Sequence, residues 1–142
     1  MEIALLANDS KKELMVQFCI AYCGVLAKHK LCATKSTGSM IYEATGLHIE
    51  QLLPGGQGGM QQLTSRISFN EIDVLIYFRD SRAKDMEHAL DDDTLVRACD
   101  LNNVPVATNV GTAEVIVTAL DRGDLDWREF VNPNSDYNRK HS

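Results

Sequence analysis

The segment spanning residues 72–78, Ile-Asp-Val-Leu-Ile-Tyr-Phe, constrains the fold of this chain more than any other. A strand with one face in water alternates apolar and polar side chains, whereas a strand covered on both faces is apolar almost throughout. Residues 72–78 show the second pattern. We therefore predict a strand inside a sheet that has helices packed against both of its faces.

Strand-like and helix-like segments alternate along the rest of the chain, which favours βαβ units and a parallel sheet. The prediction is an α/β fold, a three-layer αβα arrangement with a central, mostly parallel five-stranded sheet. Residues 35–38 are predicted to form a polar turn, and residues 84–93 to be irregular. The other predicted strands are residues 3–7, 30–34, 47–53 and 104–107. The predicted helices run from Asp9 or Ser10 to residue 28, over 39–45, from the glycine-rich segment to residue 69, and over 94–102 and 112–120.

The length of 142 residues fits a single domain, which we place at residues 1–130. We expect the polar C-terminal tail, residues 131–142, to be loosely held. The net charge of −6 argues against binding to a nucleic-acid polymer, which needs a basic face. No apolar run is long enough to cross a bilayer, and a secretion signal is missing. We therefore expect a cytoplasmic protein with no membrane partner.

The cysteines stand in apolar contexts. Cys19 and Cys23 have the i,i+4 spacing of a helix, which would allow them to hold a metal together. No Cys-x-x-Cys pair or histidine partner accompanies them, so buried, reduced thiols are the favoured interpretation. The same interpretation covers Cys32 and Cys99. We expect neither a metal nor another cofactor.

A glycine-rich segment, residues 53–62, carries four glycines in five positions directly after Pro54. Glycine is costly in regular structure and is useful where the backbone passes close to another group or adopts a positive φ. Taken alone, the segment is most simply a surface loop. However, ligands of parallel sheets bind at the carboxyl ends of the strands. That rule would bring this segment together with residues 8–9, 34–38 and 79–80.

Residues 34–38, Thr-Lys-Ser-Thr-Gly, supply hydroxyls and an ammonium group where a strand leads into a helix. Backbone N–H groups at a helix start point outward, so this segment suits a phosphate, although Ser and Thr are also common helix caps. Lys12 would add a counter-charge if it is not simply a solvated surface lysine.

Titratable groups come directly after two of the predicted strands. Asp9 and Asp80 are candidates for acid–base chemistry because neighbouring carboxylates and burial shift each other's pKa values, although a helix cap is the alternative for either. His88 lies in the segment predicted to be irregular, where a neutral imidazole would be able to polarise a carbonyl. The run of residues 91–93, Asp-Asp-Asp, is most simply a solvated capping run at a helix start.

Five motifs, which follow one another along the chain in the same order as in the methylglyoxal synthase family, resemble that family. The match extends from about residue 3 to residue 127. The resemblance implies a methylglyoxal-synthase-like α/β fold and a homohexamer. It also implies conversion of dihydroxyacetone phosphate to methylglyoxal and inorganic phosphate without a metal. The motifs are Asn8-Asp9-x-x-Lys12, Ala33-Thr34-x-Ser36-Thr37-Gly38, Gly55-x-x-Gly58-Gly59-x-Gln61-Gln62, residues 72–80, and Val104-Pro105-Val106-Ala107-Thr108-Asn109.

The resemblance also implies roles for individual residues. The positions that match acidic or histidine residues around the reacting carbons are Asp9, Asp80, His88 and Asp91, where His88 requires a one-residue insertion before it. The residues assigned to phosphate or ligand binding are Lys12, Thr34, Lys35, Ser36, Thr37, Gly55, Gly58 and Gly59.

The departures from the family pattern concern proton transfer. The family's glycine loop ends in Gly-Gly-Asp-Gln-Gln, and this Asp is the catalytic base, but the position is Met60 here. A thioether cannot accept a carbon-bound proton at neutral pH. Asn8 stands in place of a histidine, Lys35 in place of a glycine, and Pro54 in place of a serine.

The favoured hypothesis is therefore a catalytically impaired family member that binds a phosphorylated small molecule, either a metabolite or a nucleotide-type signal, and acts as a sensor or sequestering protein. The alternative is an active methylglyoxal synthase in which Asp9, Asp80 or Asp91 has taken over the role of the base. A plain oligomeric scaffold is the weakest hypothesis, because it leaves the chemistry of residues 34–38 unexplained.

Overall fold

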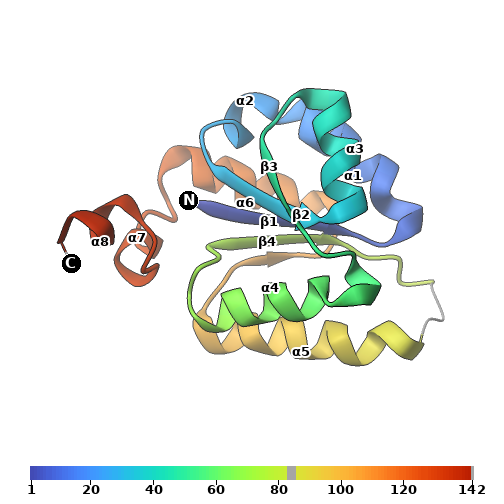
Figure 1. The fold of residues 1–142 in the computed structure, drawn as a ribbon. Coiled ribbons are helices and arrows are strands. Elements are labelled where there is room, and N and C mark those ends of the chain that lie inside the picture. Colours follow the sequence, from blue (N-terminus) through green and yellow to red (C-terminus); the bar gives the residue numbers. More distant parts are fainter. Residues whose placement is uncertain (83–85, 142) are drawn as a thin grey trace.

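The computed structural model describes residues 1–82 and 86–141, without the side chains of residues 86–89. Within these residues five strands form one sheet in the order β3-β2-β1-β4-β5, and every pairing is parallel. Helices cover both faces of the sheet (Figure 1). The predicted three-layer α/β fold with a five-stranded central sheet is confirmed. The strands are β1 (Glu2–Ala7), β2 (Lys30–Thr34), β3 (Ile49–Leu52), β4 (Val74–Phe78) and β5 (Val106–Ala107).

The two faces of the sheet have separate hydrophobic cores. On one face α1 (Lys12–Ala21), α3 (Lys35–Thr45) and α6 (Val110–Arg122) bury residues against Ile3, Leu5 and Ile76. On the other face α4 (Gly59–Ser68) and α5 (Met86–Asn102) pack against Leu6, Leu75 and Tyr77 (Figure 1). All five residues of β4 are buried, which explains the continuous apolar pattern of residues 74–78. No helix of the described parts is long and apolar enough to cross a membrane.

Two predictions about helix starts are wrong. Residues 35–38 are the first turn of α3 and not a separate turn, with Thr34 at the N-cap position. Gly38 fits inside this helix because β3 packs closely there: a Cβ atom on Gly38 would lie 3.1 Å from Gln51 Cγ. The helix α5 starts at Met86, within the segment predicted to be irregular.

The helix predicted from Asp9 or Ser10 to residue 28 is divided into three parts. A 3-10 turn, η1 (Asp9–Lys11), precedes α1, and α2 (Cys23–Leu26) comes after Tyr22, which has φ of −108°. A second 3-10 turn, η2 (Gly55–Gln57), lies in the glycine-rich segment. Cys19, Cys32 and Cys99 are buried and Cys23 is partly buried, and all four are free thiols.

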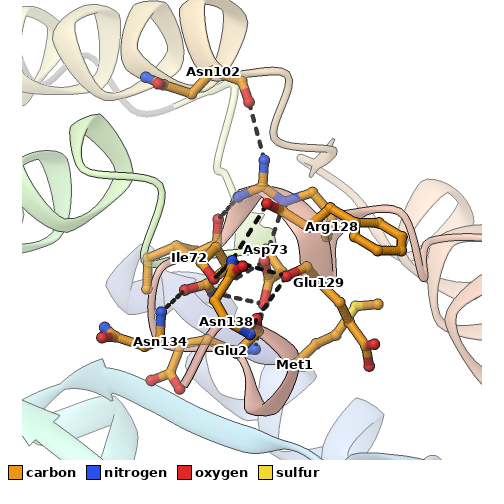
Figure 2. A network of polar contacts seen from close by, with 12 residues as sticks. Met1, Glu2, Ile72, Asp73, Asn102, Arg128, Glu129, Asn134 and Asn138 are labelled. Atoms are coloured by element: carbon orange, nitrogen blue, oxygen red, sulfur yellow. Dashed lines mark hydrogen bonds and ion pairs between the residues drawn. The ribbon is translucent and has the colours of Figure 1, made fainter. Parts of the chain in front are cut away.

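The C-terminal tail is not loosely held, which corrects the prediction. It contains the end of α7 (Arg128–Val131) and α8 (Asp136–His141). Asn132 is 3% exposed, and its Nδ2 atom donates to both carboxylate oxygens of Asp73, at 3.2 and 3.0 Å. Asn138 Nδ2 in turn donates to Asn132 O at 2.6 Å (Figure 2).

A buried ion pair anchors this C-terminal region at the amino end of the sheet. The fully buried Arg128 donates from Nε to Asp73 Oδ1 at 3.1 Å, and from Nη2 to Ile72 O at 2.9 Å (Figure 2). Its Nη1 atom donates to Asn102 O at 3.1 Å, at the end of α5. Asp73 Oδ2 also accepts from Glu2 N at 2.8 Å. One guanidinium therefore connects the C-terminal helices to β4, α5 and, through Asp73, to β1.

Candidate functional site

A cavity of about 760 Å³ lies at the carboxyl ends of β1, β2 and β4. This is the edge where parallel sheets bind their ligands. The structure brings together there all four segments that the sequence analysis placed on this edge. The lining residues are Leu6, Ala7, Asn8, Asp9, Ser10, Lys12, Thr34, Ser36, Gly55, Gly56, Met60, Tyr77, Arg79, Asp80, Ser81 and Asp92.

One end of the cavity combines a cation with a helix start. Lys12 Nζ lies 2.5 Å from Ser36 Oγ and 2.9 Å from Asp9 Oδ1. Ser36 belongs to the first turn of α3, whose backbone N–H groups have no acceptor within the helix. Thr37, in the same turn, is 1% exposed, and its hydroxyl has no hydrogen-bond partner within the described residues. Unused donors beside an ammonium group suit an anion such as phosphate.

The glycine-rich segment contributes to the cavity in two ways. Gly55 and Gly56 line it directly. Gly58 has φ of +106°, a backbone conformation that favours glycine. A Cβ atom on Gly59 would lie 2.1 Å from Leu53 O, so this position accepts no side chain. Gly58 and Gly59, which do not line the cavity, set the path of the loop from β3 into α4.

Two further residues assigned to ligand binding lie outside the cavity lining. Lys35 is exposed on the first turn of α3, and Thr37 is buried behind that turn. The remaining assigned side chains, Lys12, Thr34 and Ser36, all face the cavity.

The predicted acid–base residues differ in their surroundings. The Asp9 side chain is 97% exposed and is paired with Lys12. Asp80 accepts hydrogen bonds from Ser10 Oγ at 2.6 Å and from Arg82 N at 2.9 Å. These two hydrogen bonds, of which the one from Ser10 has the larger effect, hold the pKa of Asp80 below its usual value. A carboxylate with a lowered pKa is a weaker base.

The other two predicted acid–base residues are Asp91 and His88. Asp91 accepts from Gln61 Nε2 at 3.3 Å and is not a lining residue. The side chain of His88 lies outside the described residues. The structure therefore brings Asp9 and Asp80 to the cavity, but not Asp91.

Met60 is part of the cavity wall. The residue is 8% exposed, and its side chain belongs to the hydrophobic core that contains Leu6, Leu63 and Tyr77. It lines the cavity from the start of α4, directly after the glycines. At this position the cavity has a thioether surface and no group that takes up a proton.

Sequence reasoning missed the polar group on the β4 side of the cavity. Tyr77 Oη donates to Asp92 Oδ1 at 2.8 Å and accepts from Asn8 Nδ2 at 3.1 Å. Arg79 Nη2 lies 3.7 Å from Asp92 Oδ2. The Asp92 side chain is 13% exposed, so its assignment to a solvated capping run is wrong.

Burial, together with the hydrogen bond to Asp92, raises the pKa of Tyr77, which keeps its hydroxyl neutral. A tyrosine inside a strand covered on both faces was the available signal for this group, because a buried phenol needs a hydrogen-bond partner. Asn8 also belongs to this polar group. Its Oδ1 atom accepts from Asp80 N at 2.7 Å, and this bond joins the ends of β1 and β4.

Comparisons with known proteins agree with this architecture. The family model described as MGS-like domain matches residues 15–108. The methylglyoxal synthase of Caldicellulosiruptor saccharolyticus is 53% identical over 139 residues, which cover 98% of each chain. The methylglyoxal synthase of Geobacillus thermodenitrificans is 48% identical over 132 residues, 93% of this chain and 91% of the relative.

A solved structure is also similar. The crystal structure of methylglyoxal synthase from Elizabethkingia anophelis NUHP1 matches with a TM-score of 0.74 and 36% sequence identity. The match covers 82% of this chain and 76% of the other. Since a family model, relatives matched over nearly their full length and a solved structure all agree, the chain belongs to the methylglyoxal synthase family.

Proposed function

We propose that the cavity binds a phosphorylated small molecule, with its phosphate at Lys12 and the first turn of α3. The observation that carries this proposal is the 2.5 Å contact between Lys12 Nζ and Ser36 Oγ, which places an ammonium group directly at a helix start. A dianionic phosphate there would meet a positive charge, outward N–H groups and hydroxyl donors together. The overall charge of −6 does not prevent this, because the favourable groups are local.

The same proposal includes slow or absent turnover. A reaction that starts by removing a proton from carbon needs a positioned base, and loss of such a base costs a factor of about 10²–10⁴. Met60 offers none, Asp80 has a lowered pKa, and Asp9 is exposed and paired with Lys12. A cavity of this kind holds its ligand and releases it unchanged, which suits a sensor or a sequestering protein.

Isothermal titration calorimetry of the full chain tests the binding. The probes are inorganic phosphate, dihydroxyacetone phosphate and a panel of nucleotides. We expect at least one to bind, and Lys12→Met to weaken it tenfold or more. Lys28→Met is the matched control, because it removes the same charge from an exposed lysine that pairs with Asp121. If none of these probes binds to the native protein, the proposal is wrong.

A second candidate function is methylglyoxal synthase activity with a different base. The names of relatives that are up to 53% identical favour it. Colorimetric detection of methylglyoxal formed from dihydroxyacetone phosphate separates the two candidates. We expect the native protein to be slow and Met60→Asp to be at least a hundredfold faster. A native protein as fast as its Met60→Asp variant would establish the second candidate instead.

We also propose that the chain forms a homo-oligomer, a hexamer by analogy with the family. Exposed apolar side chains on several elements, such as Leu101 at 82% and Phe69 at 70%, are available for contacts between copies. Light scattering coupled to size-exclusion chromatography measures the assembly directly, and the mass of a monomer, 15.8 kDa, would contradict it.

A further inference from the structure

We propose that a second cavity, at the amino ends of the strands, binds a small zwitterion of about the size of a dipeptide. This cavity has a volume of about 630 Å³ and is lined by the start of the sheet and by residues of α7 and α8. It is separate from the cavity described above, because Glu2 lines the second cavity and Ala7, at the other end of β1, lines the first. Their separation along the extended strand is about 17 Å.

Hydrogen bonds and ion pairs hold the walls of the second cavity in place. Asn134 Nδ2, between α7 and α8, donates to Glu71 Oε2 at 2.9 Å (Figure 2). Arg66 of α4 donates to Glu2 Oε1 at 3.1 Å and to Glu50 Oε2 at 3.3 Å, on β1 and β3. A cavity whose walls are fixed before a ligand arrives loses little conformational entropy on binding.

Most of the charged groups that line this cavity are therefore already paired. Besides Arg66 and its two carboxylates, this holds for Asp73, which pairs with Arg128, and for Lys28, which pairs with Asp121. The amine of Met1 lies 3.1 Å from His29 Nδ1, and Arg139 is engaged within the chain as well. These groups add little net charge for a ligand to recognise.

Among the residues that the structure describes, the remaining charged or basic side chains of the cavity have no hydrogen bond or ion pair, and they form two groups. Lys30 begins β2, and the parallel register of β2 and β3 puts His48 beside it. Glu129 and Asp136 belong to α7 and α8. The sheet side of the cavity thus offers hydrogen-bond donors, and the helix side offers carboxylates. No ion pair joins the two groups within the described residues, which leaves room between them.

This arrangement favours a ligand that carries both charges. An anion alone would be attracted by Lys30 but repelled by Glu129 and Asp136, and a cation alone would be repelled by Lys30. A zwitterion places its carboxylate at Lys30 and His48, and its ammonium group then meets the carboxylates of the helix side. Such charge-assisted hydrogen bonds are about twice as strong as neutral ones. An extended dipeptide separates its two charges by about 7 Å, which suits two walls that do not touch.

Calorimetric titration of the full chain with three probes tests the assignment. The probes are glycylglycine, N-acetylglycylglycine and glycylglycinamide, which share one backbone and carry both charges, only the carboxylate and only the ammonium group, respectively. We expect glycylglycine to bind at least tenfold more tightly than either of the others. Absence of glycylglycine binding, or equal affinity for the three probes, overturns the inference. Neither result affects phosphate binding in the first cavity, so the proposed function stands or fails separately.

Two substitutions test which wall receives which end of the ligand. Both side chains are exposed, so we expect the variants to fold. Lys30→Met should reduce the preference for glycylglycine over glycylglycinamide at least threefold, because the carboxylate loses its partner. Glu129→Gln should reduce the preference over N-acetylglycylglycine at least threefold, because the ammonium group loses one of its two acceptors. Unchanged preferences in both folded variants overturn the inference.

Lys140→Met and Glu43→Gln are the matched controls. They remove the same charges from exposed side chains that line neither cavity, so we expect changes of less than twofold. An equal loss in the controls would show a general charge effect and would overturn the assignment. Lys12→Met should also keep the affinity for glycylglycine. A tenfold loss in that variant would place the dipeptide in the first cavity and would overturn the inference.

Discussion

Replacement of Arg128 by methionine should lower the free energy of unfolding by about 3 kcal/mol. Removal of one partner from a buried ion pair costs about 3–5 kcal/mol, because the remaining charge stays buried. Arg128 is fully buried and Asp73 is 3% exposed. Methionine preserves much of the apolar volume, so the loss reflects the three guanidinium hydrogen bonds, to Asp73, Ile72 O and Asn102 O. Asp73 keeps the bonds from Glu2 N and Asn132, which favours the lower end of the range.

Equilibrium urea unfolding, monitored by far-UV circular dichroism at one protein concentration, measures this change. In a domain of this size about 3 kcal/mol corresponds to a decrease of about 10 °C in the melting temperature. Arg97→Met is the control, because Arg97 and Asp93 form an exposed pair that is worth less than about 0.5 kcal/mol. Trp127, the only tryptophan, adjoins Arg128 and reports on the C-terminal helices separately.

Two results would refute this reasoning. A loss of less than about 1 kcal/mol in Arg128→Met would mean that the pair does not offset its own desolvation. A Trp127 fluorescence change at a lower urea concentration than the circular dichroism change would mean that the C-terminal helices detach alone, so that Arg128 secures them without stabilising the sheet.

Three further predictions concern the cavity, the glycine-rich segment and the thiols. Thr37→Val should raise the free energy of unfolding, because it removes an unpartnered buried hydroxyl, as urea unfolding would measure. Gly59→Ala should lower the melting temperature strongly, since its Cβ meets Leu53 O, whereas Gly56→Ala, whose Cβ meets nothing within 4 Å, should not. Burial raises the pKa of the Cys19, Cys32 and Cys99 thiols to about 12, which protects them from alkylation. Iodoacetamide at pH 8 should therefore alkylate the partly buried Cys23 first, as mass spectrometry would show.

The strands were predicted well because a buried strand gives a run of consecutive apolar residues, which is visible in the sequence. Residues 30–34 match β2 at both ends, and the segment at 72–78, which is apolar except for Asp73, identified β4 and its two covered faces. The first turn of α3 was missed because three of its residues, Ser36, Thr37 and Gly38, are individually poor helix formers. Packing decides there: Gly38 allows β3 to approach α3 closely. The C-terminal helices were missed because Arg128 and Asn132 are polar, and only their contact with Asp73 buries them.

The position of Lys12, Thr34 and Ser36 at one end of the cavity was predictable for a different reason. Lys12, Thr34 and Ser36 each lie at the end of a strand or within about one helical turn beyond it, so the rule for parallel sheets is enough to gather them. Asp92 lies 15 residues from Tyr77 in the middle of a helix, and no periodicity connects the two. The contact between Asp92 and Tyr77 depends on the packing of α5 against the sheet, which the sequence pattern does not specify.

The groups around the cavity fall into two sets. The first has fixed packing or hydrogen-bonding partners, and the second has donors that remain available to a ligand. On the β4 side, Asn8 has an amide in place of a titratable ring, Tyr77 is held neutral by burial, and Met60 has no acidic or basic group. Each of these side chains has a defined hydrogen-bonding or packing position, so it shapes the cavity and does not transfer a proton. Among the described residues at the other end, by contrast, Lys12 and the start of α3 keep donors that an anion would satisfy. We infer that the affinity of this cavity for phosphate esters is separable from proton transfer, and that substitutions at Lys12 and at Met60 will act on different measurements.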